Sequence, residues 1–231
     1  MKYTVYPQVF ELNPNIEFGI IIGRDLTVSQ STESDQRILL SAQGAARQKI
    51  DPAIIRELPN IAAARQVLQQ AGINPNKYTP SVEAMLKRVV KGSNLASINS
   101  LVDLCNAVSL ENEISLGAHD LKDIDADLEV RLSRSGDRFL PFGETIWENV
   151  EDGELIFTAG PTVQTRKWIW RQSELGKITE DTHNVFFQVA GFRDNESLKN
   201  AVQQIEQLVR DRFGGTTTTF FVNQDQSSIE F

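Results

Sequence analysis

The chain has 231 residues, the size of one large domain or of one domain with an appendage. Its 23 Lys and Arg residues against 31 Asp and Glu residues give a net charge of −8, and the pI is about 4.9. This charge excludes a protein that binds nucleic-acid backbone over a wide surface, so any contact with RNA must be local. A hydrophobic fraction of 40% with 23% charged residues excludes an intrinsically disordered chain.

Cysteine and histidine are scarce. Cys105 is the single cysteine, so it cannot form an internal disulfide, and His119 and His183 are the two histidines. Without a CxxC or HExxH motif, we expect no metal site and no cofactor. The first ten residues, MKYTVYPQVF, lack the apolar segment of a signal peptide, and no apolar run reaches the ~20 residues of a membrane helix. We therefore expect a cytoplasmic protein with no membrane partner.

The first half of the chain combines one strand with several helices. The apolar run Phe18–Gly23, bounded by polar residues, predicts a buried strand. Capping residues and apolar spacing then predict a series of helices. The first helix is capped by Ser34 and Asp35 and ends near Gln48, and the second begins at Asp51-Pro52. The third runs from Asn60 to Gly72. The fourth begins at Ser81 and ends before Gly92, and the fifth runs from Asn99 to Leu110.

The helix that begins at Ser81 has an apolar face and a basic face. Its basic face carries Lys87, Arg88 and Lys91. This face is either a solvated helix side or a small RNA-facing patch on an otherwise acidic protein.

In the second half of the chain, apolar and polar residues alternate with the two-residue period of β-strands. Leu128–Arg134 alternates apolar and polar residues, and the turn at Ser135-Gly136-Asp137 predicts a hairpin whose second strand is Arg138–Phe142. Further strands are predicted at Glu154–Thr158, Thr165–Gln172 and Thr216–Val222, and a helix at Asn195–Arg212. Val185–Phe192 is apolar enough to be a central strand. The pattern predicts a single α+β domain.

Generic catalytic motifs are absent, since the sequence has no P-loop and no GxGxxG. Seven ordered motifs instead carry a family resemblance: SVEAMLKRVVKG, INSLVDLCNAVSL, LGAHDL, VRL, FLPFGE, RKWIWRQSE and KITEDTHNVFFQVAGF. Between about Asn74 and Arg212 the chain resembles the B3/B4 domain of the phenylalanyl-tRNA synthetase β subunit, in its free-standing form. The segment Trp168–Gln172 is similar to one shared by free-standing members.

The resemblance implies a B3/B4-like core of mixed β-sheets over residues 74–231, with residues 1–73 as a mostly helical part of the same domain. It implies an editing activity: a hydrolase that deacylates mischarged aminoacyl-tRNA in trans, without a metal. The implied partners are the acceptor end of aminoacyl-tRNA and an aminoacyl-tRNA synthetase. The oligomeric state is not defined by the sequence.

The resemblance also assigns pocket positions. The family's pocket asparagine falls on Asn106 and its neighbouring threonine on Cys105. The family's histidine falls on Gly117, with His119 two places on, and its side-chain-recognising glutamate falls on Gln188. These departures imply a substrate other than tyrosine.

Each candidate residue has a structural alternative. His119 and Asp120 are the catalytic candidates, because a histidine with a pKa near 6.5 can shuttle a proton at neutral pH; both can equally be structural. The substrate-binding candidates are Asn106, Trp170, Arg171, Gln172, Gln188 and Glu144. Trp168 and Trp170 alternate, so one strand face would carry both indoles, for core packing or for stacking.

Two functions of different classes follow. The first is the trans-editing hydrolase, with canavanine on arginine tRNA as a candidate substrate, because neutral groups such as Gln188 suit a side chain of lower pKa than arginine. The second is a non-catalytic module that senses an amino acid or binds a tRNA or a synthetase. Retention of Asn106 and of the polar pair Arg171-Gln172 favours the enzyme.

Overall fold

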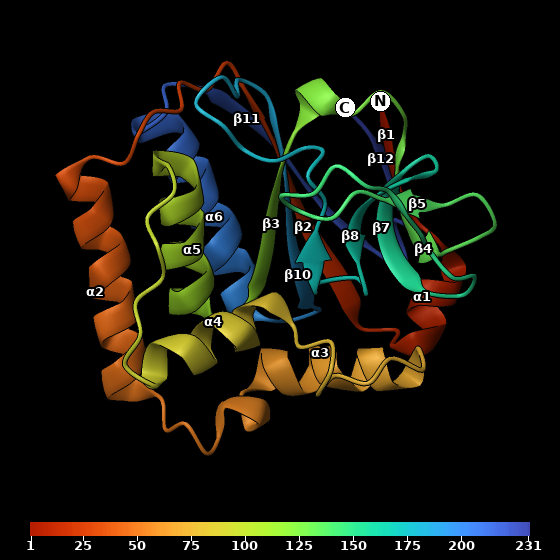
Figure 1. Cartoon of the computed structure of the whole chain (residues 1–231), viewed down its shortest axis with the longest axis horizontal. Helices are drawn as coiled ribbons and strands as arrows, with labels where there is room; N and C mark the ends of the chain where they lie inside the picture. The colour runs from red at the N-terminus through yellow and green to blue at the C-terminus, as the bar shows by residue number, and fades with distance from the viewer.

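The computed structural model describes residues 1–231 and contains two β-sheets that face each other, with helices over the outer face of the smaller sheet (Figure 1). The larger sheet has eight strands in the order β12-β1-β4-β7-β8-β5-β6, with β9 paired to β8. Its strands are β1 (Lys2–Val5), β4 (Leu128–Leu132), β5 (Arg138–Phe139), β6 (Glu148–Asn149), β7 (Leu155–Ala159), β8 (Thr162–Arg166), β9 (Arg171–Gln172) and β12 (Ser228–Glu230). The sheet is mixed, because β1 pairs with β4 and β5 with β8 in parallel.

The smaller sheet is antiparallel, in the order β11-β2-β10-β3. Its strands are β2 (Ile16–Arg24), β3 (Ser115–Asp120), β10 (Val185–Phe192) and β11 (Thr216–Asn223). The helices are α1 (Pro7–Leu12), α2 (Glu33–Lys49), α3 (Pro59–Gln70), α4 (Ser81–Val90), α5 (Ser100–Asn112) and α6 (Glu196–Asp211). No helix combines the length and the apolar character needed to cross a bilayer.

The central strand is β10, as the sequence predicts. All eight of its residues are buried, and it pairs with β2 on one side and β3 on the other. Phe186 and Ala190 face the core between the sheets, whereas Phe187 and Val189 pack against α5 and α6. A strand that is apolar at every position but Gln188 suits this place, because both faces of the small sheet are covered.

The N-terminal segment is built into both sheets. β1 lies between β12 and β4 in the larger sheet, and β2 lies between β11 and β10 in the smaller one. The amino group of Met1 donates to the carbonyl oxygen of Phe231 at 3.0 Å, so the two chain ends lie together. Residues 1–73 therefore contribute two strands as well as α1, α2 and α3.

The predicted helix at Asp51-Pro52 is wrong. That segment forms turns and a 3-10 turn at Ile55–Glu57. The reason is Pro59, because the residue before a proline avoids the helical region, and Leu58 has an extended ψ of 131°.

The predicted hairpin of Leu128–Arg134 with Arg138–Phe142 is also wrong. The turn forms, but β4 pairs with β1 and β7, and β5 pairs with β6 and β8. The physical reason is Asp137, which binds Arg131 through both carboxylate oxygens, at 2.6 and 2.9 Å. The turn is thereby held against β4, and β5 is directed to another neighbour.

The predicted strand Thr165–Gln172 is two strands. β8 ends at Arg166, the chain reverses, and β9 returns antiparallel along β8. Lys167 and Trp168 make the reversal with φ of 49° and 64°, in the left-handed region that residues other than glycine rarely adopt.

Candidate functional site

A cavity of about 80 Å³ lies between the two sheets, and we call it the inter-sheet cavity. Strands β3 and β10 supply one wall, and β8, β9 and the reversal between them supply the other; Ser81 at the start of α4 closes one end. Its polar lining consists of Ser81, Ser115, His119, Thr165, Gln172 and Gln188, and Trp168 and Trp170 also border it. Three of the sequence-predicted residues, His119, Gln172 and Gln188, are therefore brought together here, with Trp170 as a fourth.

His119 lies on the cavity face of β3 and is only 1% exposed. Its ring packs edge to face against Phe157 of the larger sheet, with centroids 5.0 Å apart. Burial lowers the pKa of His119 to about 3, because an apolar environment disfavours the charged imidazolium. The side chain is therefore neutral at physiological pH, in contrast to the unperturbed pKa on which the proton-shuttle hypothesis depends.

The tautomer of His119 follows from its neighbour. Nδ1 lies 3.4 Å from Nε2 of Gln172, and an amide nitrogen can only donate. We therefore assign Nδ1 as the acceptor of this contact, which places the proton on Nε2. A Cβ atom built on Gly117 would lie 3.2 Å from that Nε2. His119 thus leans into the space above position 117, where the resemblance places the family's histidine.

Gln172 ties the two sheets together. It belongs to β9 of the larger sheet, and its amide donates to the carbonyl oxygen of Ala118 on β3, at 3.0 Å. Since β3 is an edge strand of the smaller sheet, this carbonyl has no strand partner on that side. The side chain of Gln172 therefore supplies the hydrogen bond that the Ala118 carbonyl lacks at the sheet edge, and it also borders the cavity.

Gln188 lies on β10, directly opposite Gly117 on β3. Its Oε1 accepts a hydrogen bond from the hydroxyl of Tyr3, at 3.0 Å, in the core. The amide nitrogen makes no hydrogen bond within the protein, and the side chain borders the cavity. The bond from Tyr3 fixes which end of the amide is the free donor.

The reversal that carries the two tryptophans is held by Glu154. This buried carboxylate accepts from Nε and Nη2 of Arg166, at 3.0 and 2.7 Å, from the backbone nitrogen of Lys167, at 3.1 Å, and from the Lys167 ammonium. Burial by itself would raise the pKa of Glu154, but the bonds from Arg166 and Lys167 outweigh it and lower the pKa. The strained backbone is therefore fixed by four contacts to one carboxylate.

The two indoles do not share a strand face. Trp168 is fully buried and packs edge to face on Phe18, and its Nε1 has no hydrogen-bond partner. Trp170 is half-buried at the cavity rim and packs edge to face on Tyr78, with centroids 4.9 Å apart. The predicted alternation fails because the left-handed reversal lies between the two strands.

Asn106 lies in a different hollow, which we call the outer hollow. It has a volume of about 270 Å³ and a mostly apolar lining that includes Cys105 and Phe142. Asn106 is on α5, so it and Gln188 lie on opposite faces of the smaller sheet. Gln172 borders both spaces.

The remaining candidates do not line the inter-sheet cavity. Asp120 is buried, and its two oxygens accept from the hydroxyl of Thr182, at 2.6 Å, and from the backbone nitrogen of Lys122, at 2.9 Å. Glu144 is exposed in the loop after β5, and Arg171 is exposed on β9. The cavity therefore has no Asp, Glu, Lys or Arg side chain in its wall.

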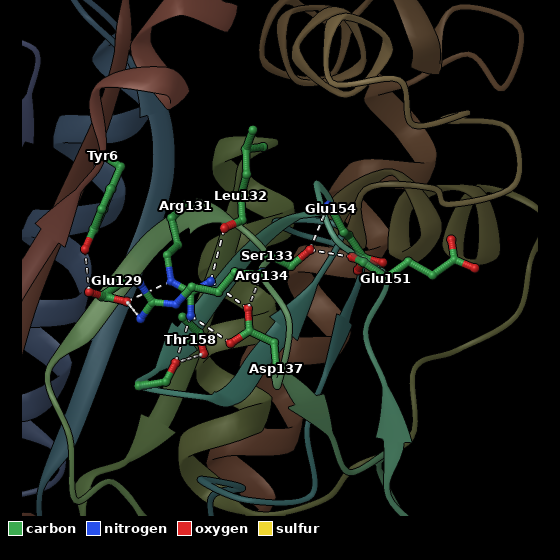
Figure 2. Close-up of polar contacts among 11 residues, drawn as sticks. Tyr6, Glu129, Arg131, Leu132, Ser133, Arg134, Asp137, Glu151, Glu154 and Thr158 are labelled. Carbon is green, nitrogen blue, oxygen red and sulfur yellow. Dashed lines mark hydrogen bonds and ion pairs between the residues drawn. The ribbon is translucent and has the colours of Figure 1, made fainter.

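A second polar cluster, around Arg131, is shown in Figure 2. The buried guanidinium donates to Glu129, to Asp137, and to the carbonyl oxygens of Leu132 and Gly160, at 2.6 to 3.0 Å. All of its N–H groups are thereby satisfied. This cluster is structural, since it leaves no donor free for a ligand.

Sequence reasoning missed several lining residues. Ser81, Ser115 and Thr165 border the cavity, and Tyr3 orients Gln188. Nothing local in the sequence indicates these roles, since Tyr3 and Gln188 lie 185 positions apart.

Comparison with known proteins gives one family. The B3/4 domain family matches residues 63–212. The chain is 29% identical over 121 residues to the phenylalanine–tRNA ligase beta subunit of Chromobacterium violaceum, a match that covers 52% of this chain and 15% of that protein. An N-terminal fragment of the phenylalanyl-tRNA synthetase beta-subunit from Pyrococcus horikoshii is similar with a TM-score of 0.44 and 12% identity, over 96% of this chain and 55% of that one.

The chain thus spans only a small part of the length of its curated relative, 15%. The family match covers well over half of the chain and includes α4, α5, β3, β10 and the reversal between β8 and β9. It confirms the resemblance carried by the sequence motifs, and the chain belongs to the B3/4 domain family.

Proposed function

We propose that the protein hydrolyses the ester bond of mischarged aminoacyl-tRNA in trans. The observation that carries the proposal is the inter-sheet cavity, where His119, Gln172 and Gln188 converge in a member of the B3/4 family. A relative of this chain is named as a ligase for phenylalanine tRNA, which supports tRNA as the class of partner. Such a reaction belongs in the cytoplasm, and a synthetase is the second partner that we propose.

The arrangement of the two spaces suits an aminoacyl ester. We place the amino-acid side chain in the inter-sheet cavity and the terminal adenosine over the outer hollow, whose apolar wall and Asn106 amide suit a nucleobase. Gln172 borders both spaces, so this placement brings the ester next to it. It also gives Asn106 a binding role from the opposite face of the sheet.

The chemistry needs little more than positioning, because an aminoacyl ester is already reactive. The oxygen of a water molecule attacks the carbonyl carbon, the bond from that carbon to the ribose oxygen breaks, and the ribose oxygen takes up the proton that the water releases. We assign His119 to this step as a neutral donor, whose Nε2–H stabilises the developing negative charge on the carbonyl oxygen. Asp120 is then a positioning residue that holds the end of β3 through Thr182 and Lys122.

One observation favours a second candidate function, a non-catalytic amino-acid sensor or binding module. No carboxylate and no thiol lines the inter-sheet cavity, and the one histidine there has a pKa of about 3. A binding site has no need of a general base.

A deacylation panel separates the two functions. The purified protein is incubated with radiolabelled aminoacyl-tRNAs that include non-cognate pairs, small polar amino acids, and canavanyl-tRNA for arginine tRNA, which is the candidate that the sequence offers. We expect at least one ester to be released well above its spontaneous rate. Binding of an amino acid by calorimetry with no ester released would transfer the assignment to the sensor.

A further inference from the structure

We infer that the inter-sheet cavity selects an amino acid whose side chain is short, uncharged and able to form hydrogen bonds. The inference rests on the proposed function for the identity of the ester, but it concerns the selectivity of the cavity itself. It is argued from three properties of the lining: its volume, its charge and its unused hydrogen-bonding capacity.

The volume excludes large side chains. The cavity measures about 80 Å³, whereas a cavity that binds benzene measures about 150 Å³. An aromatic ring therefore does not fit, and neither does an extended guanidino chain. The walls cannot easily recede, because Trp168 and Phe157 are fully buried in the core and buried cores are close-packed.

The lining excludes charge. It contains no Asp, Glu, Lys or Arg side chain, and His119 beside it is neutral because burial lowers its pKa to about 3. The buried carboxylates of Asp120, at the end of β3, and of Glu154 are already occupied by protein donors. A cation or an anion placed in the cavity would be buried without a counter-charge, which is strongly unfavourable.

The lining demands a polar partner. The Tyr3 hydroxyl holds Oε1 of Gln188, so the Gln188 amide N–H groups remain as donors toward the cavity. The hydroxyls of Ser81 and Ser115 lie 3.3 Å apart and face the same space. The Ser81 hydroxyl already donates to that of Ser115, so the donors that a purely apolar side chain would leave unpaired are the Gln188 amide N–H groups. A site built for hydrogen bonds rejects such an analogue by orders of magnitude. A hydroxyl or a carboxamide on a short chain meets all three conditions.

The test uses pairs of probes that differ by one group. The probes are stable 3′-amides of adenosine that carry threonine or valine, serine or alanine, and tyrosine, arginine or canavanine. Binding is measured by calorimetry, and hydrolysis is measured on the corresponding aminoacyl-tRNAs. We expect the threonyl amide to bind at least tenfold more tightly than the isosteric valyl amide, and the tyrosyl and arginyl amides to bind more weakly than either.

The variant Gln188→Glu tests whether Gln188 recognises the polar side chain of the ligand. It keeps the shape of the side chain but removes the amide N–H donors that face the cavity. We expect it to abolish the preference for threonine over valine, while the matched exposed change Gln30→Glu leaves that preference intact. A wild-type protein that binds the valyl, tyrosyl or canavanyl amide as tightly as the threonyl amide would overturn the inference. Hydrolysis of large substrates alone would overturn the inference about selectivity but support the proposed function. Absence of all hydrolysis, with the preference for the threonyl amide intact in binding, would refute the proposed function and support the inference.

Discussion

Glu154 and Lys167 are joined by two contacts, because the carboxylate accepts from both the backbone nitrogen, at 3.1 Å, and the side-chain ammonium of the same residue. The backbone of Lys167 and of Trp168 is left-handed, and such a conformation in residues other than glycine costs of order 1–3 kcal/mol and persists only when its surroundings impose it. Glu154 supplies that constraint, and the strained reversal in turn places Trp168 and Trp170 at the cavity.

The variant Glu154→Gln tests this constraint. We expect it to lower the free energy of unfolding by about 2–4 kcal/mol, because it leaves Lys167 partly buried without a counter-charge and leaves Arg166 with Glu148 alone. Tryptophan fluorescence should shift to longer wavelength as the reversal loosens and the indoles become more hydrated. Both are measured by urea unfolding followed at the tryptophan emission.

The matched control is Glu151→Gln, since Glu151 is exposed and only three positions away. We expect it to change stability by less than about 0.5 kcal/mol. Equal effects of the two changes would show that Glu154 contributes nothing beyond surface charge.

Much of the fold is predictable from the sequence, for local reasons. Val185–Phe192 is apolar except for Gln188 and is the central strand. The Thr32 and Asp35 side chains form a capping box at the start of α2, so the predicted helix there is found within two residues of its bounds. In each case the signal lies within a few neighbouring residues.

Features that depend on distant partners are not predictable in this way. The reversal at Lys167 is imposed by Glu154, thirteen positions away, and no pattern inside Thr165–Gln172 indicates it. The candidate site shows the same limit: the resemblance identifies Gln188, but its orientation depends on Tyr3 at the other end of the chain. Gln188 borders the inter-sheet cavity and Asn106 borders the outer hollow, because the smaller sheet, with β3 at its edge, separates the two.

The neutral state of His119 predicts a specific pH dependence of stability. Its pKa of about 3 in the folded protein lies below the value of 6.5 for an exposed histidine, so between these pH values the unfolded chain binds a proton that the folded chain does not. Stability must therefore fall as the pH falls from 6.5 toward 3, by up to about 1.4 kcal/mol per pH unit. Carboxylates titrate in the same range, so the measurement is a comparison.

The comparison is between wild type and His119→Gln, by denaturant unfolding at pH 7, 6, 5 and 4. The difference in unfolding free energy between the two proteins should decrease as the pH decreases, because glutamine does not titrate. Gln30→Asn is the control, since Gln30 is exposed and neither side chain titrates, and it should give a flat difference. A flat difference for His119→Gln as well would show that the imidazole is solvated in the folded protein.

If the protein acts on aminoacyl-tRNA as proposed, the basic side chains beside the cavity rim predict where the RNA backbone binds. The ammonium of Lys77 and that of Lys167 lie 5.0 and 4.8 Å from the centre of the Tyr78 ring, which packs on Trp170, and Arg171 follows Trp170 in the chain. On a protein of net charge −8, this is a local basic and aromatic group next to the candidate site. Lys77→Glu with Arg171→Glu should weaken aminoacyl-tRNA binding at least tenfold and flatten its salt dependence.

The basic face of α4 is the alternative RNA contact, and it supplies the matched variant. Lys87 there is already paired with the buried Glu83, at 2.6 Å, which leaves Arg88 and Lys91. If the rim binds the RNA, Arg88→Glu with Lys91→Glu leaves the affinity within about twofold. The reverse ranking of the two double variants would move the RNA contact to α4.

The last prediction concerns Asn106 and Gln188, which lie on opposite faces of the smaller sheet and border separate spaces. Asn106→Ala and Gln188→Ala should each lower deacylation by at least about tenfold, corresponding to ~1.4 kcal/mol in the transition state. Because the two side chains share no contact, their effects on transition-state free energy should add to within about 0.5 kcal/mol in the double variant. The assay is kcat/KM on the best substrate of the panel, with folding checked by thermal melting. Strong coupling between the two changes would mean that both residues contact one group of the substrate, and the placement of the adenosine over the outer hollow would then be wrong.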